Sequence, residues 1–308
     1  MYYFIVNPNA RRGMGGKIWA KLERQLDHAG TEYKVCMTEK PGDARAYAEA
    51  ITENCRDPRI VIAVGGDGTV NEILDGLSFA GQVTLGYIPS GSGNDLARSL
   101  KLPRSPKRCL KKVLNPRYHK CMDYGVVSYG EDEREHRRFM VSCGIGLDAA
   151  VCHALLDARS KKKPRLFRPG RISYMLLGLK ELFLAYPVGG YLLLDGVKKV
   201  EFNHIYFVSA HIHPYEGGGF RFAPQADCTD GKLEVCVVHH STKPNLLPVL
   251  ADAWFGRTGH HRGVRFFSCR ELQIHLEHPM PVHVDGESCY CQQDIHLQCI
   301  EKKIRMMV

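Results

Sequence analysis

Apolar runs and helix-like spacings alternate regularly over the first hundred residues. The apolar run at residues 60–64 has no polar position, which is typical of a strand covered on both faces in a parallel sheet. Ile18, Leu22 and Leu26 recur at helical spacing. The expected strands are residues 2–6, 33–37, 60–64 and 84–88, and the expected helices are residues 18–30, 43–55, 69–77 and 94–100. The alternation predicts an α/β domain with a parallel sheet.

The pattern changes after residue 103. A basic helix near residues 107–114 precedes expected strands at 121–129 and 139–143, and an apolar helix is expected at 172–186. In residues 190–238 and 264–299, short segments alternate with turn signals, which is typical of an antiparallel sheet or sandwich. We therefore expect an α/β domain at residues 1–124 and an all-β sandwich domain at 125–308. The last strand or tail of the chain could return to the first domain.

Composition narrows the function classes only slightly. The chain has 308 residues, of which 44% are hydrophobic and 24% are charged, so long disorder is excluded. The net charge of +9 favours anionic partners, namely nucleotides, acidic lipid surfaces or nucleic acid. No helix-turn-helix or zinc-finger spacing is present, so no nucleic-acid partner is expected.

The cysteines and the apolar segments of the sequence indicate a cytoplasmic protein. The twelve cysteines form no CxxC pair and are interpreted as free thiols in a reducing compartment. The first residues are apolar and then basic, the reverse of the order in a signal peptide. Lys180, Glu181 and Pro187 interrupt the most apolar stretch, so any membrane contact should be peripheral, at the inner face.

The strongest local motif is GGDGTVNE at residues 65–72, which follows an expected strand and opens an expected helix. Glycines there let backbone N–H groups approach phosphate oxygens, and a helix N-terminus favours anions. Asp67 would repel a phosphate, so it should face Mg²⁺, a protonated hydroxyl or a network of donors. The alternative is a tight turn in which Asp67 or Thr69 caps the helix.

A second glycine-rich loop, PSGSGND at residues 89–95, has the same context. Two such loops at the carboxyl ends of neighbouring strands could clamp one ligand. Two other glycine-rich segments do not match known nucleotide-binding motifs. Residues 11–18 carry Arg11 and Ile18 where a P-loop needs glycine and a hydroxyl, and residues 144–149 lack the βαβ context of a dinucleotide site.

Five motifs in order resemble the diacylglycerol-kinase-like family of bacterial lipid kinases, relatives of sphingosine and ceramide kinases. They are GGDGTVNE, IPSGSGNDLAR, CGIGLDA, GGGFRFAPQADCTDGKLEV and HVDGE. NAD kinases share the GGDG loop but not the later motifs. The resemblance implies an NAD kinase/diacylglycerol kinase-like fold, with an α/β nucleotide domain and a C-terminal β-sandwich. It also implies ATP- and Mg²⁺-dependent phosphorylation of a hydroxyl on diacylglycerol or a related lipid.

The resemblance also implies binding residues. The ATP contacts would be Asn7, Thr38, Gly65, Gly66, Asp67, Gly68, Thr69, Val70, Asn71 and Ser92. Ser92 stands where the family usually has threonine, and it keeps the hydroxyl. A Mg²⁺ site would use the Asp230 carboxylate and the carbonyls of Asp227 and Lys232, hard oxygen ligands that suit this ion. Without the resemblance, this segment predicts a polar hairpin turn.

The DGE motif would supply the residue that takes the proton from the lipid hydroxyl. We favour Glu287 as this base, with Asp285 orienting it. The reverse assignment stays open, and Asp67 is a third candidate. Without the resemblance, DGE between strands predicts a hairpin turn.

Other assignments remain open. The same loops would serve an NAD kinase-like or other small-molecule kinase, or a non-catalytic nucleotide- or lipid-sensing regulator, and a homodimer is compatible with the sequence. A basic run precedes the apolar 172–186 helix, which favours docking on an anionic membrane: Arg159, Lys161, Lys162, Lys163, Arg165, Arg168 and Arg171. A zinc site from Cys289, Cys291, His283 and His296 is disfavoured, because C-x-C on one strand face does not supply four convergent ligands.

Overall fold

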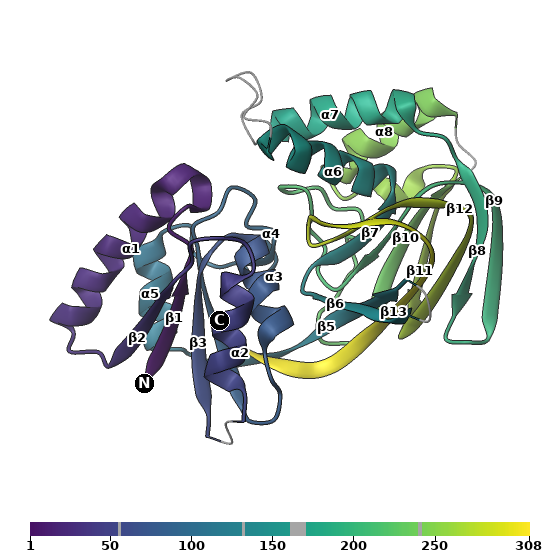
Figure 1. The fold of residues 1–308 in the computed structure, drawn as a ribbon. Coiled ribbons are helices and arrows are strands. Elements are labelled where there is room, and N and C mark those ends of the chain that lie inside the picture. The colour runs from purple at the N-terminus through teal and green to yellow at the C-terminus, as the bar shows by residue number, and fades with distance from the viewer. Residues whose placement is uncertain (55–56, 131–132, 161–170, 240–241) are drawn as a thin grey trace. The chain divides into compact units, whose positions relative to one another are not determined.

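The computed structural model describes residues 1–54, 57–130, 133–160, 171–239 and 242–308 (Figure 1). Contacts between Cα atoms divide the chain into two compact units. Residues 1–123 and 302–308 form the first unit, and residues 124–301 form the second. The final segment of the chain is therefore part of the first unit.

The first unit is built on a parallel sheet. Its strand order is β13-β4-β3-β1-β2, to which β13 contributes only its last residues. The strands are β1 (Tyr2–Val6), β2 (Tyr33–Met37), β3 (Arg59–Gly65), β4 (Val83–Pro89) and β13 (Glu287–Met307), and the helices are α1 (Ala10–His28), α2 (Asp43–Thr52), α3 (Asp67–Gly76), α4 (Asp95–Ser99) and α5 (Pro106–Leu114). The alternation predicted from the sequence is present throughout.

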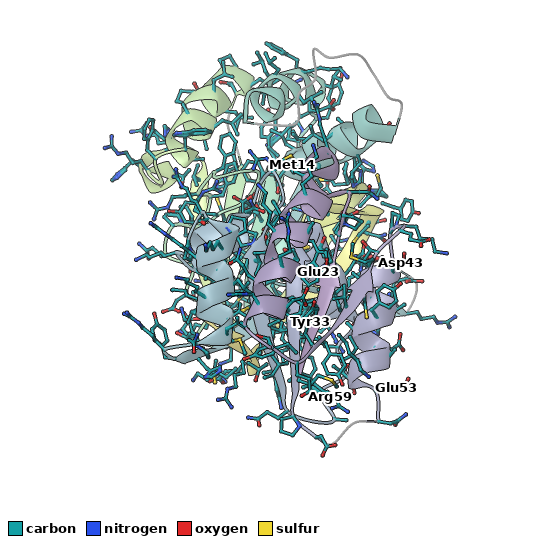
Figure 2. All side chains as sticks on the ribbon, turned by 90° about the vertical axis from the view of Figure 1, so that its left-hand side faces the viewer. Met14, Glu23, Tyr33, Asp43, Glu53 and Arg59 are labelled. Atoms are coloured by element: carbon teal, nitrogen blue, oxygen red, sulfur yellow. The ribbon has the colours of Figure 1, made fainter. Side chains whose placement is uncertain are left out.

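The core of this unit joins α1 to the sheet. Trp19 and Leu22 of α1 are buried against Phe4 of β1, and the Phe4 and Trp19 ring centroids are 5.2 Å apart. The indole N–H of Trp19 donates to Glu23 at 3.1 Å, so the polar atom of the buried ring has a partner. Figure 2 labels Glu23 on α1. Apolar spacing along α1 thus fixes the helix on the sheet.

The second unit is antiparallel, and it also carries helices. Its strands are β5 (His119–Tyr129), which begins in the first unit, β6 (Glu135–Phe139), β7 (Ser142–Gly146), β8 (Val188–Leu194), β9 (Lys198–His211), β10 (Leu233–His239), β11 (Val264–Cys269), β12 (Glu271–Val284) and most of β13. The described helices are α6 (Leu147–Ser160), α7 (Arg171–Leu184), α8 (Lys243–Ala253) and the short 3₁₀ turn η2 (Thr258–His260). The unit is therefore strand-rich without being all-β.

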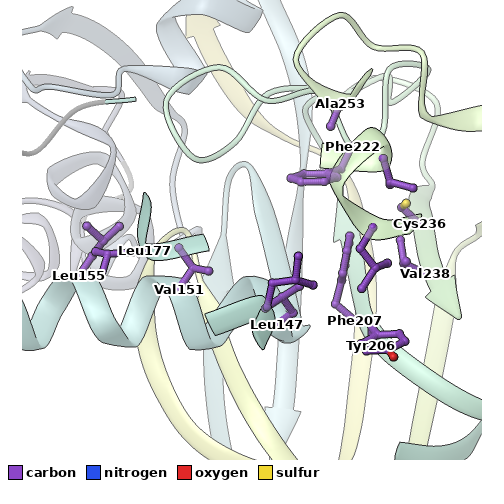
Figure 3. Close-up of a cluster of buried hydrophobic side chains, with 13 residues drawn as sticks. Leu147, Val151, Leu155, Leu177, Tyr206, Phe207, Phe222, Cys236, Val238 and Ala253 are labelled. Carbon is purple, nitrogen blue, oxygen red and sulfur yellow. The ribbon is translucent and has the colours of Figure 1, made fainter. Parts of the chain in front are cut away.

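These helices share one core with the strands (Figure 3). Leu147 and Val151 of α6 lie in the same buried cluster as Phe207 of β9 and Phe222. The Phe207 and Phe222 rings meet edge to face, with centroids 5.3 Å apart. We did not predict α6 or α8 from the sequence.

Two further expectations were wrong. The strand expected at residues 139–143 is broken, because β6 ends at Phe139 and β7 begins at Ser142. Cys289 and Cys291 do not share a face, since Cys289 is buried and Cys291 is exposed. Tyr290 between them has φ +60°, which interrupts the alternation of side chains along β13.

Every cysteine that the structure describes is a free thiol. No helix among the described residues has both the length and the hydrophobicity needed to cross a membrane.

Candidate functional site

The first glycine loop joins β3 to α3. Gly65 ends the strand, Gly66 precedes the helix, and a Cβ on Gly65 would lie 2.4 Å from the Thr69 hydroxyl oxygen. Asn7, just after β1, donates from its side-chain amide to the same hydroxyl at 3.2 Å. The structure therefore brings together Asn7, Gly65 and Thr69, three of the predicted ATP contacts.

The second glycine loop packs directly on the first. The N–H groups of Ser90 and Gly91 donate to the Gly65 carbonyl at 2.7 and 3.1 Å. A Cβ on Gly91 would lie only 2.4 Å from the Cα of Gly66. Such a separation does not occur for real side chains, so the contact between the loops requires glycine at position 91. The two loops are therefore adjacent, as expected from the sequence, and their clamping of one ligand stays a prediction.

Asp67 faces a network of donors. Its two carboxylate oxygens accept the N–H groups of Asp95 and Leu96, at 3.1 and 3.2 Å. These residues open α4, so Asp67 caps the helix after the second loop and does not cap its own helix. Of the environments expected for Asp67, a donor network is the one observed among its described contacts.

Asn94 is a loop residue that we did not single out from the sequence. Its side-chain oxygen accepts from the Gly91 N–H at 3.0 Å and from the Tyr87 hydroxyl at 3.3 Å, while its amide donates to the Gly91 carbonyl. Burial raises the pKa of Tyr87, which keeps its hydroxyl protonated as a donor. Asn94 has φ +53°, a region in which asparagine is enriched, and this tolerance was the available signal.

The remaining predicted ATP contacts differ in accessibility. Thr38 and Asn71 are buried, the Val70 side chain lies in the core, and the Val70 N–H donates to the Gly66 carbonyl at 3.2 Å. Ser92 is exposed at the second loop. Gly68 lies in the first turn of α3. One further residue supports this region: Glu72 accepts the N–H groups of Gly42 and Ala44, at 3.0 and 3.2 Å, and so holds the start of α2.

The predicted metal segment is a compact polar turn before β10. The Asp227 carboxylate accepts from the backbone and hydroxyl of Thr229, and Asp230 accepts the Lys232 N–H at 3.0 Å. Asp227 and Asp230 are exposed. Glu301 adds a further carboxyl group, since its Cδ lies 3.2 Å from where a Cβ on Gly231 would be. Exposed hard oxygen donors with room for water ligands fit Mg²⁺.

The DGE motif forms the two-residue turn between β12 and β13. Asp285 and Gly286 have φ +48° and +88°, the signs that a type I′ hairpin turn requires, and Glu287 pairs with Val284. Glu287 is exposed. The turn therefore presents a carboxylate at a fixed position in the hairpin.

The Asp285 carboxylate accepts hydrogen bonds from the backbone of residues 140–142, which are distant in the sequence. It accepts the N–H groups of Met140, Val141 and Ser142 at 2.8, 2.9 and 2.9 Å. The Asp285 N–H in turn donates to the Ser142 carbonyl at 2.9 Å. These bonds take the donors that would have paired a strand across residues 139–143, which explains the break between β6 and β7.

The basic run that we associated with membranes lies largely outside the described residues, which omit positions 161–170. The helix that follows it is described in part, and several of its apolar side chains are exposed. They are Leu176, Leu179, Phe183 and Leu184, with Tyr186 just beyond the helix. The Lys243 ammonium donates to the Phe183 carbonyl at 2.6 Å and lies 5.1 Å from the Tyr186 ring centroid.

Comparison with known proteins agrees with this organisation. The diacylglycerol kinase catalytic domain matches residues 1–127, and the YegS C-terminal NAD kinase beta sandwich-like domain matches residues 141–307. The predicted fold class, an α/β domain followed by a β-sandwich domain, is confirmed. A crystal structure of a diacylglycerol kinase from Bacillus anthracis has a TM-score of 0.69 at 20% identity, and the match covers 99% of this chain and 96% of that one.

Named relatives match over most of their length. The "Probable lipid kinase YegS-like" of Chromohalobacter salexigens is 30% identical, over 86% of this chain and 81% of its own. The diacylglycerol kinase of Bacillus subtilis is 25% identical, over 92% and 88%, and that of Mycobacterium tuberculosis is 26% identical, over 92% and 87%. With both domain matches in the order that the motifs indicated, this chain belongs to the diacylglycerol-kinase-like family of lipid kinases.

Proposed function

We propose that the protein is an ATP- and Mg²⁺-dependent kinase that phosphorylates the hydroxyl of diacylglycerol or a related lipid. The observation that carries this proposal is the direct contact of the two glycine loops, Gly66 against Gly91. It brings two stretches of glycine backbone together next to the first turn of α3, whose first N–H groups have no acceptor within the helix. This arrangement suits the phosphates of a nucleotide.

The acceptor chemistry is assigned to the second unit. In the proposed reaction the lipid hydroxyl oxygen attacks the γ-phosphorus of ATP, the bond to the ADP oxygen breaks, and the hydroxyl proton passes to the Glu287 carboxylate. Glu287 is accessible for this role, and the carboxylate of Asp285 anchors the turn that carries it. Asp230, with the carbonyls of Asp227 and Lys232, would hold Mg²⁺, which neutralises phosphate charge when bound.

A lipid substrate also requires access to a membrane surface. The exposed apolar residues of α7 support peripheral docking, since Phe183 is 66% exposed and Tyr186 is 80% exposed. Lys243 places a cation 5.1 Å from the Tyr186 ring centroid, and Lys180, which pairs with Glu181 at 3.5 Å, follows the exposed Leu179 in the chain. Apolar groups flanked by cations are the features that bind an anionic bilayer.

Radiolabelled ATP with a panel of acceptors tests the proposal. The panel contains diacylglycerol, other hydroxyl-bearing membrane lipids, sphingoid bases and NAD, with products separated by chromatography. Label should enter a lipid, and chelation of Mg²⁺ should abolish the transfer. Label in NAD alone would establish a small-molecule kinase, while ATP binding with transfer to no acceptor would establish a regulator. Either result would overturn the proposal.

A further inference from the structure

Asp148, Cys152 and His283 form a buried polar triad in the second unit. Asp148 and Cys152 lie one turn apart on α6, His283 lies on β12, and their ligand-type atoms are all within 4.8 Å of one another. The His283 side chain is only 3% exposed. A Cβ on Gly144 would lie 2.0 Å from the Asp148 carboxylate and 2.4 Å from the His283 ring, so this approach needs the glycine of the CGIGLDA motif.

The hydrogen bonds of His283 with Asp148 and Gly286 fix its tautomer, and Cys152 is a further hydrogen-bond partner of the ring. Its Nε2 is 2.8 Å from Asp148 Oδ2, and its Nδ1 is 3.2 Å from the backbone nitrogen of Gly286. A backbone N–H can only donate, so Nδ1 must be the acceptor. The bond from Gly286 therefore requires a neutral ring, whose proton is on Nε2 and is donated to Asp148.

This tautomer decides between a metal centre and a hydrogen-bonded triad. Carboxylate, thiol and imidazole are ligand types that zinc accepts. A metal on Nε2 would displace the proton to Nδ1, where it would face the Gly286 N–H. The observed bond between Gly286 and Nδ1 therefore favours a hydrogen-bonded triad over a metal centre.

We propose that His283 is a positioning residue for Glu287, through the amide of Gly286. This inference rests on the proposed function of Glu287. Asp148 orients the imidazole, the imidazole accepts the Gly286 N–H, and Gly286 is followed directly by Glu287. The turn is thus held on both sides, by the Asp285 carboxylate on residues 140–142 and by His283 on Gly286.

Two substitutions at His283 separate its hydrogen bond with Asp148 from its hydrogen bond with Gly286. In His283→Asn the side-chain oxygen can take the place of Nδ1 and keep the acceptor for Gly286. In His283→Gln the amide can take the place of Nε2 and keep the donor to Asp148, but it leaves the Gly286 N–H without this acceptor. Positioning predicts that His283→Gln lowers kcat by about tenfold to a hundredfold with little change in the KM for ATP. His283→Asn should retain more of the kcat.

His153→Gln is the matched control. His153 also lies on α6 and bonds to the backbone of β12, at 2.9 Å from the Val282 carbonyl, without contact to Gly286 in the described bonds. The His153→Gln variant should have a kcat near the wild-type value. Equal losses of kcat in His283→Asn, His283→Gln and His153→Gln would mean that His283 only stabilises the strand, and would overturn the inference.

Two measurements do not depend on kinase activity. NMR of the imidazole nitrogens should show the proton of His283 on Nε2, and the Gly286 amide should exchange faster in His283→Gln than in His283→Asn. A proton on Nδ1, or zinc retained by the purified protein at this triad, would overturn the inference. If the wild-type protein phosphorylated no lipid while both NMR results held, the proposed function would fail and the hydrogen-bonded turn would stand.

Discussion

Gly66 and Gly91 approach each other so closely that a side chain on Gly91 would overlap Gly66, while one on Gly66 would be tightly packed. A Cβ would lie 3.1 Å from the opposing Cα if placed on Gly66, and 2.4 Å if placed on Gly91. Gly91→Ala should therefore separate the two loops more than Gly66→Ala does, and Gly66→Val should act more strongly than Gly66→Ala. Calorimetry should show a larger loss of ATP affinity in Gly91→Ala than in Gly66→Ala.

Gly178→Ala serves as the control for this series. Gly178 lies in α7, and a Cβ there would be 3.9 Å from its nearest neighbour, which is ordinary contact. Its ATP affinity should equal that of the wild type. Undiminished ATP affinity in Gly91→Ala or Gly66→Val, with the fold intact, would contradict the assignment of these loops to nucleotide binding.

Asp67→Asn tests whether the cap of α4 is needed for nucleotide binding. The two described bonds use different carboxylate oxygens, so an amide can keep only one of them and sets its NH₂ group against the other N–H. We expect a loss of about 1 kcal/mol in the free energy of unfolding, as for other helix caps, together with weaker ATP binding. Chemical denaturation and calorimetry measure the two effects.

Asp195→Asn is a matched control for Asp67→Asn. One oxygen of Asp195 accepts both the Arg270 and Glu271 N–H groups, so asparagine can keep both bonds. Stability and ATP affinity should stay close to the wild type. If Asp67→Asn abolished turnover while stability and ATP affinity were unchanged, Asp67 would be the base.

Glu287→Gln separates catalysis from binding. Glutamine has nearly the same shape but cannot take the proton, so kcat should fall by about 10² to 10⁴ with little change in ATP affinity. Glu277→Gln removes an exposed carboxylate from the neighbouring strand β12 and should be neutral. Near-normal turnover of Glu287→Gln in the lipid assay would exclude Glu287 as the base.

Asp230→Asn should raise the Mg²⁺ concentration needed for half-maximal turnover, because an amide oxygen binds the ion more weakly than a carboxylate. Saturating Mg²⁺ should restore much of the activity, which it should not do for Glu287→Gln. Asp294→Asn alters an exposed carboxylate that pairs with His275, and should not change the Mg²⁺ requirement. An unchanged requirement in Asp230→Asn would remove this residue from the metal site.

Phe183→Asp tests membrane docking through α7. A carboxylate in place of an exposed ring should weaken sedimentation with anionic vesicles, both by losing apolar contact and by repelling the lipid charge. Val197→Asp is the control, because Val197 is also apolar and exposed, at 86%, but lies in the turn between β8 and β9. Equal vesicle binding by both variants would show that α7 does not dock. Binding by the wild type should also weaken as salt rises.

The first unit could be predicted well because its signals are local. A buried parallel strand needs a continuous apolar run, and the expected strand at residues 2–6 coincides with β1, as that at 33–37 does with β2. Helix ends were less accurate: α1 begins at Ala10, ahead of Ile18, through Arg11 and Arg12 in left-handed conformations. The spacing of apolar residues does not predict that the helix begins at Ala10 or that these two arginines are left-handed.

The parts of the second unit that we missed depend on distant residues. Residues 139–143 have the composition of a strand, but Asp285 binds their N–H groups from the far end of the chain. We recognised Asp285 by its motif, whereas this bonding pattern required the fold. His283 was considered only as a zinc ligand, because the sequence does not show that Asp148 and Gly286 lie on either side of its ring.

The end of β13 completes the sheet of the first unit, although it is synthesised after almost all of the rest of the chain. Arg305 and Met306 pair with Thr84 and Leu85, and Met307 lies in the core beside Phe4 and Trp19. This sheet edge joins residues separated by most of the chain, a non-local closure that slows folding. During synthesis the first 123 residues emerge long before their closing strand, and the whole second unit is made in between. The first unit therefore completes its sheet only after residues 302–308 have been made, and until then its β4 edge is unpaired, a state that favours aggregation.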